Sequence, residues 1–234
     1  MDSYEFEILP QPTDVSCGPT CLHAVYKYYG DEVNLEQLIT TVRQLKDGGT
    51  LAVMLGNHAL KRGYRARIYT YNLHVFDPSW FVPGVDISEK LKQQVLFKNS
   101  RKLKQATKAY LKFLELGGEI RYNCLTADLI RSQLEKGRPI LTGLSATFLY
   151  GSKREIGETN TYDDIKGEAS GHFVVISNID SEGLKVTIAD PLASNPIHPD
   201  TQLYQVEVEK VINAILLGIV TYDANLLIIE PKDS

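Results

Sequence analysis

The stretch Gln11–Cys21, QPTDVSCGPTC, decides how the rest of the chain is interpreted. Cys17 is followed by Gly18 and Pro19, and apolar residues then recur at helical spacing, which predicts a helix over 18–29. Proline suits a first helical turn because its missing N–H would have no intrahelical partner there. The stretch therefore places a thiol at the entrance of a helix, where the positive end of the helix dipole favours a thiolate.

Cys17 has two interpretations at this point. A cysteine at the start of a helix is often only a small apolar residue of the core. It is a nucleophile where a base and an oxyanion donor lie close to it. Gln11 is a candidate oxyanion donor if residues 12–16 fold back, although a glutamine in a loop is commonly just solvated.

Length and composition indicate a globular protein. The chain has 234 residues, of which 43% are hydrophobic and 23% charged, and its net charge is −4. So mild a charge argues against nucleic acid as a partner. The apolar run 214–220 is too short to span a bilayer, and residues 1–12 lack the pattern of a secretory signal. We therefore expect no membrane partner and a cytoplasmic location, which three cysteines also fit because at least one must be free.

The apolar pattern predicts three N-terminal helices followed by a strand-rich half. After the first helix, Asn34 is expected to cap a second that ends at 47–49, and Thr50 to cap a third that runs to Arg62. Further helices are predicted over 126–137 and 209–217, and strands over 64–71, 138–144, 172–179, 184–190, 203–208 and 225–230. The short strand over 138–144 is predicted to be buried, which is typical of the middle of a sheet. This succession is typical of the α+β class.

Two segments depart from this pattern. Residues 73–125 join an aromatic, proline-punctuated part to a Lys-rich helical part, and we take them as a helical insertion, or lid, within one domain over 1–234. The basic side chains of the Lys-rich part are suited to attract an acidic peptide, although a charged helix is often only a solvated face; they are Lys98, Arg101, Lys102, Lys104, Lys108 and Lys112. Residues 150–170 are polar and show no periodicity, which predicts a long mobile loop.

His172 is the candidate base among five histidines. His23 lies on the same predicted helix as Cys17 but about 240° around it, so the two side chains point apart. His172 follows the predicted loop and opens a strand, where a scaffold can present a side chain at a cleft. The alternative is a histidine at a strand end that bonds only to the backbone.

The hairpin that follows bears on this choice. If residues 181–183 form a three-residue turn with Gly183 left-handed, Asp180 pairs with Leu184 and Asp190 falls opposite Val174. Asp190 then shares a sheet face with the histidine and lies diagonal to it, within reach of the imidazole. A two-residue turn would put it on the opposite face. An aspartate before a proline is otherwise a common start of a turn.

A cysteine, histidine and aspartate so arranged have defined roles. The thiolate attacks a carbonyl, the imidazole exchanges protons with the leaving amine, and the carboxylate orients the imidazole. Cys21, one turn after Cys17, has no further ligand cluster near it in the sequence, so we expect it in the core and expect no metal.

The stretch 11–30 together with SGHFVVISNID (170–180) and VTIADP (186–191) resembles the peptidase C39-like branch of the papain-like cysteine peptidases. The resemblance implies a papain-like fold with N-terminal helices packed on an antiparallel sheet. It further implies a triad of Cys17, His172 and Asp190, with Gln11 as oxyanion donor and no cofactor. The best-known members process leader peptides after a double glycine and are fused to an export transporter. This sequence shows neither a membrane segment nor an ATPase, so the substrate is not carried over.

Three functions follow from these expectations. The leading one is a hydrolase that cleaves a peptide or isopeptide-type amide through an acyl-enzyme on Cys17, with a peptide or small amide as its partner. The first alternative is a transferase that passes the same acyl group to an amine. The second is a peptide-binding module whose triad is idle.

Overall fold

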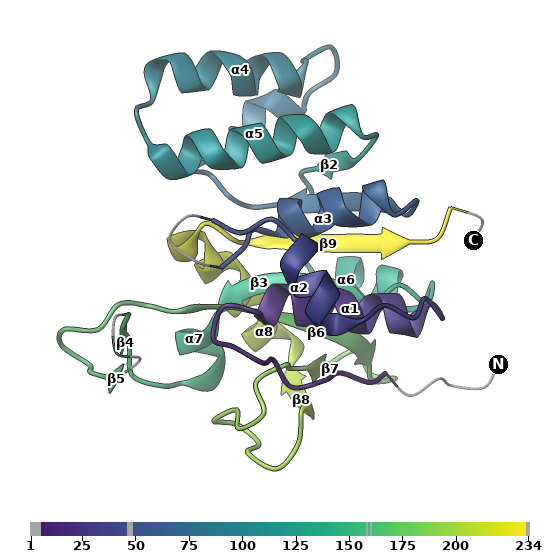
Figure 1. The fold of residues 1–234 in the computed structure, drawn as a ribbon, viewed down its shortest axis with the longest axis vertical. Coiled ribbons are helices and arrows are strands. Elements are labelled where there is room, and N and C mark those ends of the chain that lie inside the picture. The colour runs from purple at the N-terminus through teal and green to yellow at the C-terminus, as the bar shows by residue number, and fades with distance from the viewer. Residues whose placement is uncertain (1–5, 46–48, 158, 160, 233–234) are drawn as a thin grey trace.

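A seven-stranded sheet organises the protein (Figure 1). The computed structural model describes residues 6–45, 49–157, 159 and 161–232. The strand order is β2-β1-β9-β3-β6-β7-β8, and neighbouring strands are antiparallel except for β1 and β2. The strands are β1 (Arg65–Thr70), β2 (Glu119–Arg121), β3 (Ile140–Ser145), β6 (Gly171–Ile179), β7 (Lys185–Ala189), β8 (Leu203–Glu207) and β9 (Asn225–Glu230). The predicted position of β3 in the middle of the sheet is therefore confirmed.

Helices cover both faces of this sheet, so the protein has three layers and the predicted α+β class is confirmed. One face carries α1 (Cys17–Tyr28), α2 (Leu35–Thr41), α3 (Ala52–Lys61) and α5 (Arg101–Glu115). The other carries α6 (Ala127–Leu134), α7 (Ala146–Tyr150) and α8 (Val208–Leu217). Strand β6 serves both layers, because Phe173 and Val175 join the first core and Val174 and Ile176 the second.

The helical part of 73–125 is a pair of helices, α4 (Ile87–Phe97) and α5, which follow the 3-10 turn η1 (Pro78–Phe81). Ser100 separates the two helices, since its side chain accepts from the N–H of Leu103 and caps α5. Figure 1 shows this α4–α5 hairpin beyond α3, at the top of the view. Strand β2 follows it and pairs in parallel with β1, so this segment also extends the main sheet.

Phe113 fixes the hairpin to the rest of the protein. It is fully buried at the end of α5, in the same core as α1 and α3. A Cβ atom on Gly56 of α3 would lie 2.7 Å from the Phe113 ring, and one on Gly118 would lie 2.4 Å from it. Both glycines therefore leave the room that this aromatic ring fills.

The second helix is shorter than expected. Asn34 caps it as predicted, since its side chain accepts from the N–H of Gln37, but the helix ends at Thr41 rather than at 47–49. The Thr41 hydroxyl donates to the Gln37 carbonyl, and Val42 is already extended, with φ −70° and ψ 125°. Of the predicted end, residues 47 and 48 lie outside the described residues.

The third helix begins later than expected. Its N-cap residue is Leu51, not Thr50. The Thr50 hydroxyl donates instead to the carbonyl of Arg43, 3.0 Å away. Thr50 therefore holds the preceding loop rather than the helix, and the expectation of a Thr50 cap was wrong.

Residues 150–170 contain paired backbone where the sequence predicts only a loop. Strands β4 (Glu155–Ile156) and β5 (Thr161–Tyr162) form an antiparallel ribbon, and Glu155 also bridges to Glu168. The ribbon has only two residues in each strand and is held by backbone pairing, so it leaves no apolar periodicity in the sequence.

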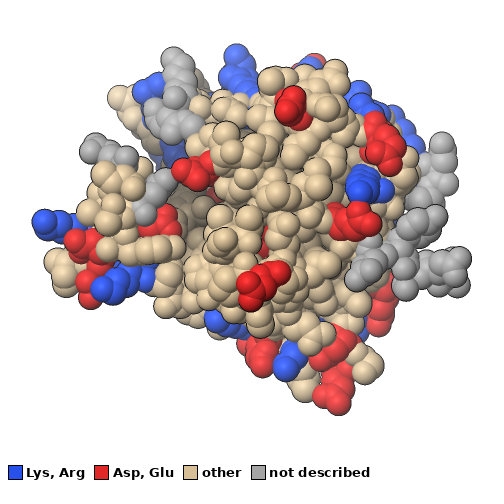
Figure 2. Space-filling view, turned by 60° about the horizontal axis from the view of Figure 1, so that its bottom comes forward, with Lys and Arg blue, Asp and Glu red and all other residues tan. Residues whose placement is uncertain are grey.

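Figure 2 shows one face of the molecule, on which both signs of charge are scattered and uncharged residues form most of the centre. This mixture agrees with the small net charge of −4. Over the residues that the structure describes, no helix is both long and apolar enough to cross a membrane.

Replacing Phe113 with Ala tests how the hairpin is anchored. Because Phe113 is fully buried, the loss should lower the free energy of unfolding by about 3–5 kcal/mol in urea titrations. The matched control is Phe97→Ala, since Phe97 on α4 is 88% exposed and its loss should change stability by less than ~0.5 kcal/mol. Equal effects of the two substitutions would contradict the packing described.

Candidate active site

The chain before α1 folds back on itself and presents Cys17. The Ser16 hydroxyl donates to the Thr13 carbonyl (2.8 Å) and accepts from the Thr13 N–H (2.9 Å). Ser16 makes no side-chain cap to α1, and the first turn holds no acidic residue. Cys17 therefore lies, half-buried, at the positive end of a helix whose own first turn holds no acidic side chain.

Gly18 lets this helix end approach the sheet closely. A Cβ atom there would lie 2.6 Å from Thr50 Cγ2 and 3.3 Å from the Phe173 ring on β6. Because Phe173 directly follows His172, this close contact brings the start of α1 next to the start of β6.

His172 and Asp190 are joined by a hydrogen bond of 2.8 Å between Nε2 and Oδ1. The imidazole is 8% exposed and the carboxylate is completely buried. Cys17 also raises the pKa of His172, so its thiol lies within interaction range of the imidazole. Since Nε2 bonds to Asp190, Nδ1 is the ring nitrogen that remains for the sulfur. The structure thus brings together three residues that are up to 173 positions apart in the numbering of the chain.

The register of the β6–β7 hairpin differs from the one expected, although it leads to the same place. Asp180 pairs with Lys185, not with Leu184, because the loop has four residues, with Gly183 left-handed at φ 74°. A bulge between Ile176 and Asn178 then shifts the register back by one. Val175 consequently pairs with Ala189, which brings Asp190 to the level of Val174.

Two tyrosines that the sequence did not reveal complete the surroundings of Asp190. Tyr150 at the end of α7 and Tyr204 on β8 both donate to Asp190 Oδ2, at 2.9 and 2.7 Å. The N–H of Leu192 donates to Oδ1 at 2.9 Å. Tyr204 pairs with Ile188 across β7 and β8, so a correct prediction of that strand pairing would have placed Tyr204 near Asp190. The sequence around Tyr150 holds no signal of its contact with Asp190.

This network sets the protonation of the pair. Burial alone would raise the pKa of Asp190, but its hydrogen bond to His172 and the charge of that residue outweigh burial and lower it. Burial alone would lower the pKa of His172, but hydrogen bonds to Asp190 and Cys17, and their charges, raise it to about 10. Burial and Asp190 raise the pKa values of Tyr150 and Tyr204, which therefore stay protonated as donors. The site consequently favours an imidazolium paired with the Asp190 carboxylate.

Gln11 is anchored beside this site by its backbone. Its N–H donates to the carbonyl of Pro191, the residue after Asp190, at 2.8 Å. Its side-chain Nε2 donates to the Thr13 carbonyl at 3.0 Å. An amide carries two N–H donors, so one fixes its orientation and the second stays available to a ligand.

The other cysteines lie elsewhere. Cys21 is completely buried, as expected, and its thiol lies 3.2 Å from the Phe173 carbonyl, while Cys124 is exposed. Over the described ranges, His, Cys, Asp and Glu side chains form no group of three that would hold a metal ion.

The family of this chain follows from a match that covers residues 4–211, from before the Gln11 loop to within α8. The chain belongs to the Peptidase_C39 like family. All of the candidate site residues lie inside the matched range. No curated protein matches the chain.

Solved structures that resemble this chain include peptidases. A protein from Bacillus anthracis described as a C39-like peptidase has a TM-score of 0.50 and 16% identity, over 97% of this chain and 96% of that one. The peptidase domain of Streptococcus ComA, a bi-functional ABC transporter involved in quorum sensing, has a TM-score of 0.46 and 15% identity, over 97% and 100%. At 16% identity the likeness to the Bacillus anthracis protein shows the fold alone.

The raised pKa of His172 predicts a pH-dependent stability. A group whose pKa rises from 6.5 to about 10 on folding adds stability that is complete below 6.5 and lost as the pH rises toward 10. Asp190, whose pKa is lowered from 3.8, adds stability above that value. In a Cys17→Ser background, the destabilisation caused by His172→Gln should therefore be largest between about pH 4 and 6.5. Urea titrations across that range and up to pH 10 measure it, and a constant difference would contradict the assignment.

Proposed function

We propose that the protein is a cysteine peptidase or amidase that acts through an acyl-enzyme on Cys17. The observation that carries this proposal is the 2.8 Å bond between His172 and the buried Asp190, with the other ring nitrogen directed to Cys17. A completely buried carboxylate is costly to retain unless it is paired and hydrogen-bonded, and this one orients an imidazole beside a thiol. Membership of the C39-like family supports a peptide as substrate.

Each group has one role in the proposed reaction. The Cys17 thiolate adds to the carbonyl carbon, and the second N–H of the Gln11 amide stabilises the oxyanion. The tetrahedral intermediate collapses, the C–N bond breaks, and His172 gives its Nδ1 proton to the leaving amine. Water then loses a proton to His172 and attacks the thioester, which breaks the C–S bond and frees the acid and Cys17. Asp190 holds the imidazole through Nε2 in both steps.

We also infer that residues 1–234 form one domain, with 73–125 as an insertion. Supporting this, Phe113 of the α4–α5 hairpin lies in the same core as α1, and β2 belongs to the main sheet. The three cysteines are all free, which supports the reducing environment of the cytoplasm.

Thiol alkylation separates a working triad from an idle one. At about pH 6 a free cysteine is almost entirely protonated, so an activated Cys17 should react with iodoacetamide at least about tenfold faster. Mass spectrometry should place the modification on Cys17, and His172→Gln should remove the acceleration. A Cys17 that reacts no faster than free cysteine would leave the binding-module alternative ahead.

Gln11→Ala tests the oxyanion donor. On a peptide chosen from a library because wild type cleaves it and Cys17→Ala does not, loss of one donor should lower kcat about 10²–10³-fold with little change in KM. Val15→Ala in the same loop, where Val15 is 43% exposed, should behave as wild type. An unchanged kcat in Gln11→Ala would remove Gln11 from the mechanism.

The same assay with wild type and an added amine separates hydrolase from transferase. A product in which the acyl group is joined to that amine would favour the transferase.

A further inference from the structure

Charge is unevenly distributed along this chain. Residues 90–114 contain eight Lys and Arg residues and not one Asp or Glu, although the net charge of the whole protein is −4. This segment forms nearly all of the α4–α5 hairpin. The hairpin is therefore strongly basic on a protein that is otherwise acidic, and it will attract anions over a distance of roughly 8 Å at physiological ionic strength.

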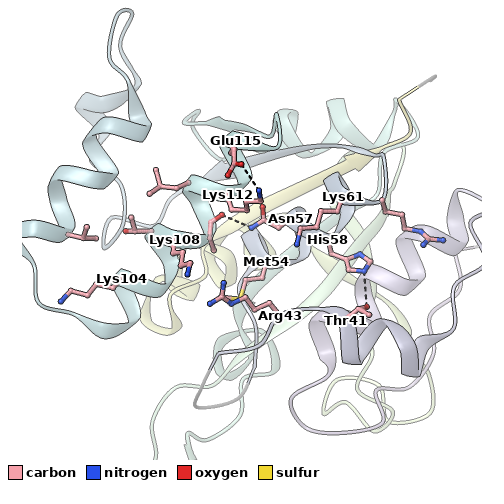
Figure 3. A pocket seen from close by; sticks show the side chains of 15 residues that line it. Thr41, Arg43, Met54, Asn57, His58, Lys61, Lys104, Lys108, Lys112 and Glu115 are labelled. Atoms are coloured by element: carbon pink, nitrogen blue, oxygen red, sulfur yellow. Dashed lines mark hydrogen bonds and ion pairs between the residues drawn. The ribbon is translucent and has the colours of Figure 1, made fainter.

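A groove of about 960 Å³ runs between α5 and α3, and three of the basic residues of the hairpin line it (Figure 3). One wall carries Lys104, Lys108 and Lys112, which are spaced one helical turn apart along roughly 12 Å of α5. The opposite side carries Arg43 and the end of α3. None of the triad residues lines this groove, so it is distinct from the candidate active site.

Much of this positive charge has no counter-ion within the described residues. Arg62 pairs with Asp31 at 2.6 Å, and Lys112 pairs with Glu115, the sole acidic residue among the described ones that line the groove. The side chains of Arg43, Lys61 and Lys108, by contrast, form no hydrogen bond or ion pair in the described part of the chain. His58 also lines the groove, and its pKa is lowered, first by burial and then by the charges of Arg62 and Lys61.

The groove also contains groups suited to a peptide rather than to a phosphate. Asn57 donates through Nδ2 to the Ala109 carbonyl at 2.9 Å, while its Oδ1 is buried and accepts from no described group. A peptide backbone supplies N–H donors for such an oxygen, whereas phosphate oxygens only accept. Met54, Val95 and Leu111 add apolar surface between the charges. An extended chain with alternating acidic and apolar side chains matches this combination.

We propose that the groove between α3 and α5 binds an acidic peptide segment that carries apolar residues between its carboxylates. Its carboxylates lie against the Lys104, Lys108 and Lys112 row on one side and against Arg43 and Lys61 on the other. The identification of this peptide as part of the substrate rests on the proposed function. The binding itself does not need Cys17.

Fluorescence anisotropy with a labelled peptide of Glu, Leu and Ala tests this site, with the same peptide carrying Gln for Glu as a reference. The protein is the full chain with Cys17→Ala, so the probe stays intact. Lys104→Glu combined with Lys108→Glu should weaken binding of the acidic probe at least about tenfold. Lys90→Glu combined with Arg101→Glu changes the net charge equally on the same hairpin but outside the groove, and it should weaken binding less than about twofold.

A second variant and a competitor make the outcome decisive. Lys61→Gln on the opposite wall should weaken binding in the same direction, and circular dichroism with thermal unfolding checks that each variant is folded. Equal weakening by the two charge-reversed pairs, or equal binding of the Gln peptide, would overturn the site. Binding of pyrophosphate in place of the peptide would overturn the ligand class. If the acidic probe does not bind but Cys17 is still alkylated rapidly, the groove proposal is wrong and the proposed peptidase function stands.

Discussion

The hydrogen bond between His172 and the buried Asp190 is the constraint on which the site depends. A carboxylate removed completely from water costs several kcal/mol unless other groups replace its hydration. Here four donors do so, from His172, Tyr150, Tyr204 and the backbone of Leu192. Three separate elements, β6, α7 and β8, therefore converge on one residue at the end of β7. Because Nε2 of His172 bonds to this carboxylate, Nδ1 is the one ring nitrogen that remains for Cys17.

The fold brings the thiol to this nitrogen by a close contact that only glycine allows. A side chain at position 18 would collide with Thr50 and crowd Phe173. Because Gly18 has none, the N-terminus of α1 packs directly against the start of β6. The loop before the helix returns through Thr13 and Ser16 and places Gln11 against Pro191. Cys17, His172, Asp190 and Gln11 consequently lie at one junction between a helix and the ends of two strands. The α4–α5 hairpin lies apart from this junction and adds a basic groove that none of the triad residues lines.

The sequence predicted the parts of this arrangement that local patterns encode. Helix α1, the central strand β3, the cap at Asn34 and the left-handed Gly183 all follow from periodicity or backbone preference. The level of Asp190 was also correct, but through two errors that cancel, because a longer turn is offset by a bulge at Ile176. Tyr150 could not be predicted, since its role depends on a contact with a residue 40 positions away. The β4–β5 ribbon was not predicted for a related reason, because its strands are joined by backbone pairing, which leaves no pattern of side chains in the sequence.

The charge state of the sulfur tests the account most directly. A thiolate absorbs ultraviolet light more strongly than a thiol, so the difference in absorbance between the protein and its Cys17→Ala variant reports the thiolate as the pH is raised. The account predicts that this difference is already present at about pH 6 and moves to about pH 8 or above when His172→Gln removes the imidazolium. An absorbance difference that appears only near pH 8.5, and is the same with and without His172, would contradict it.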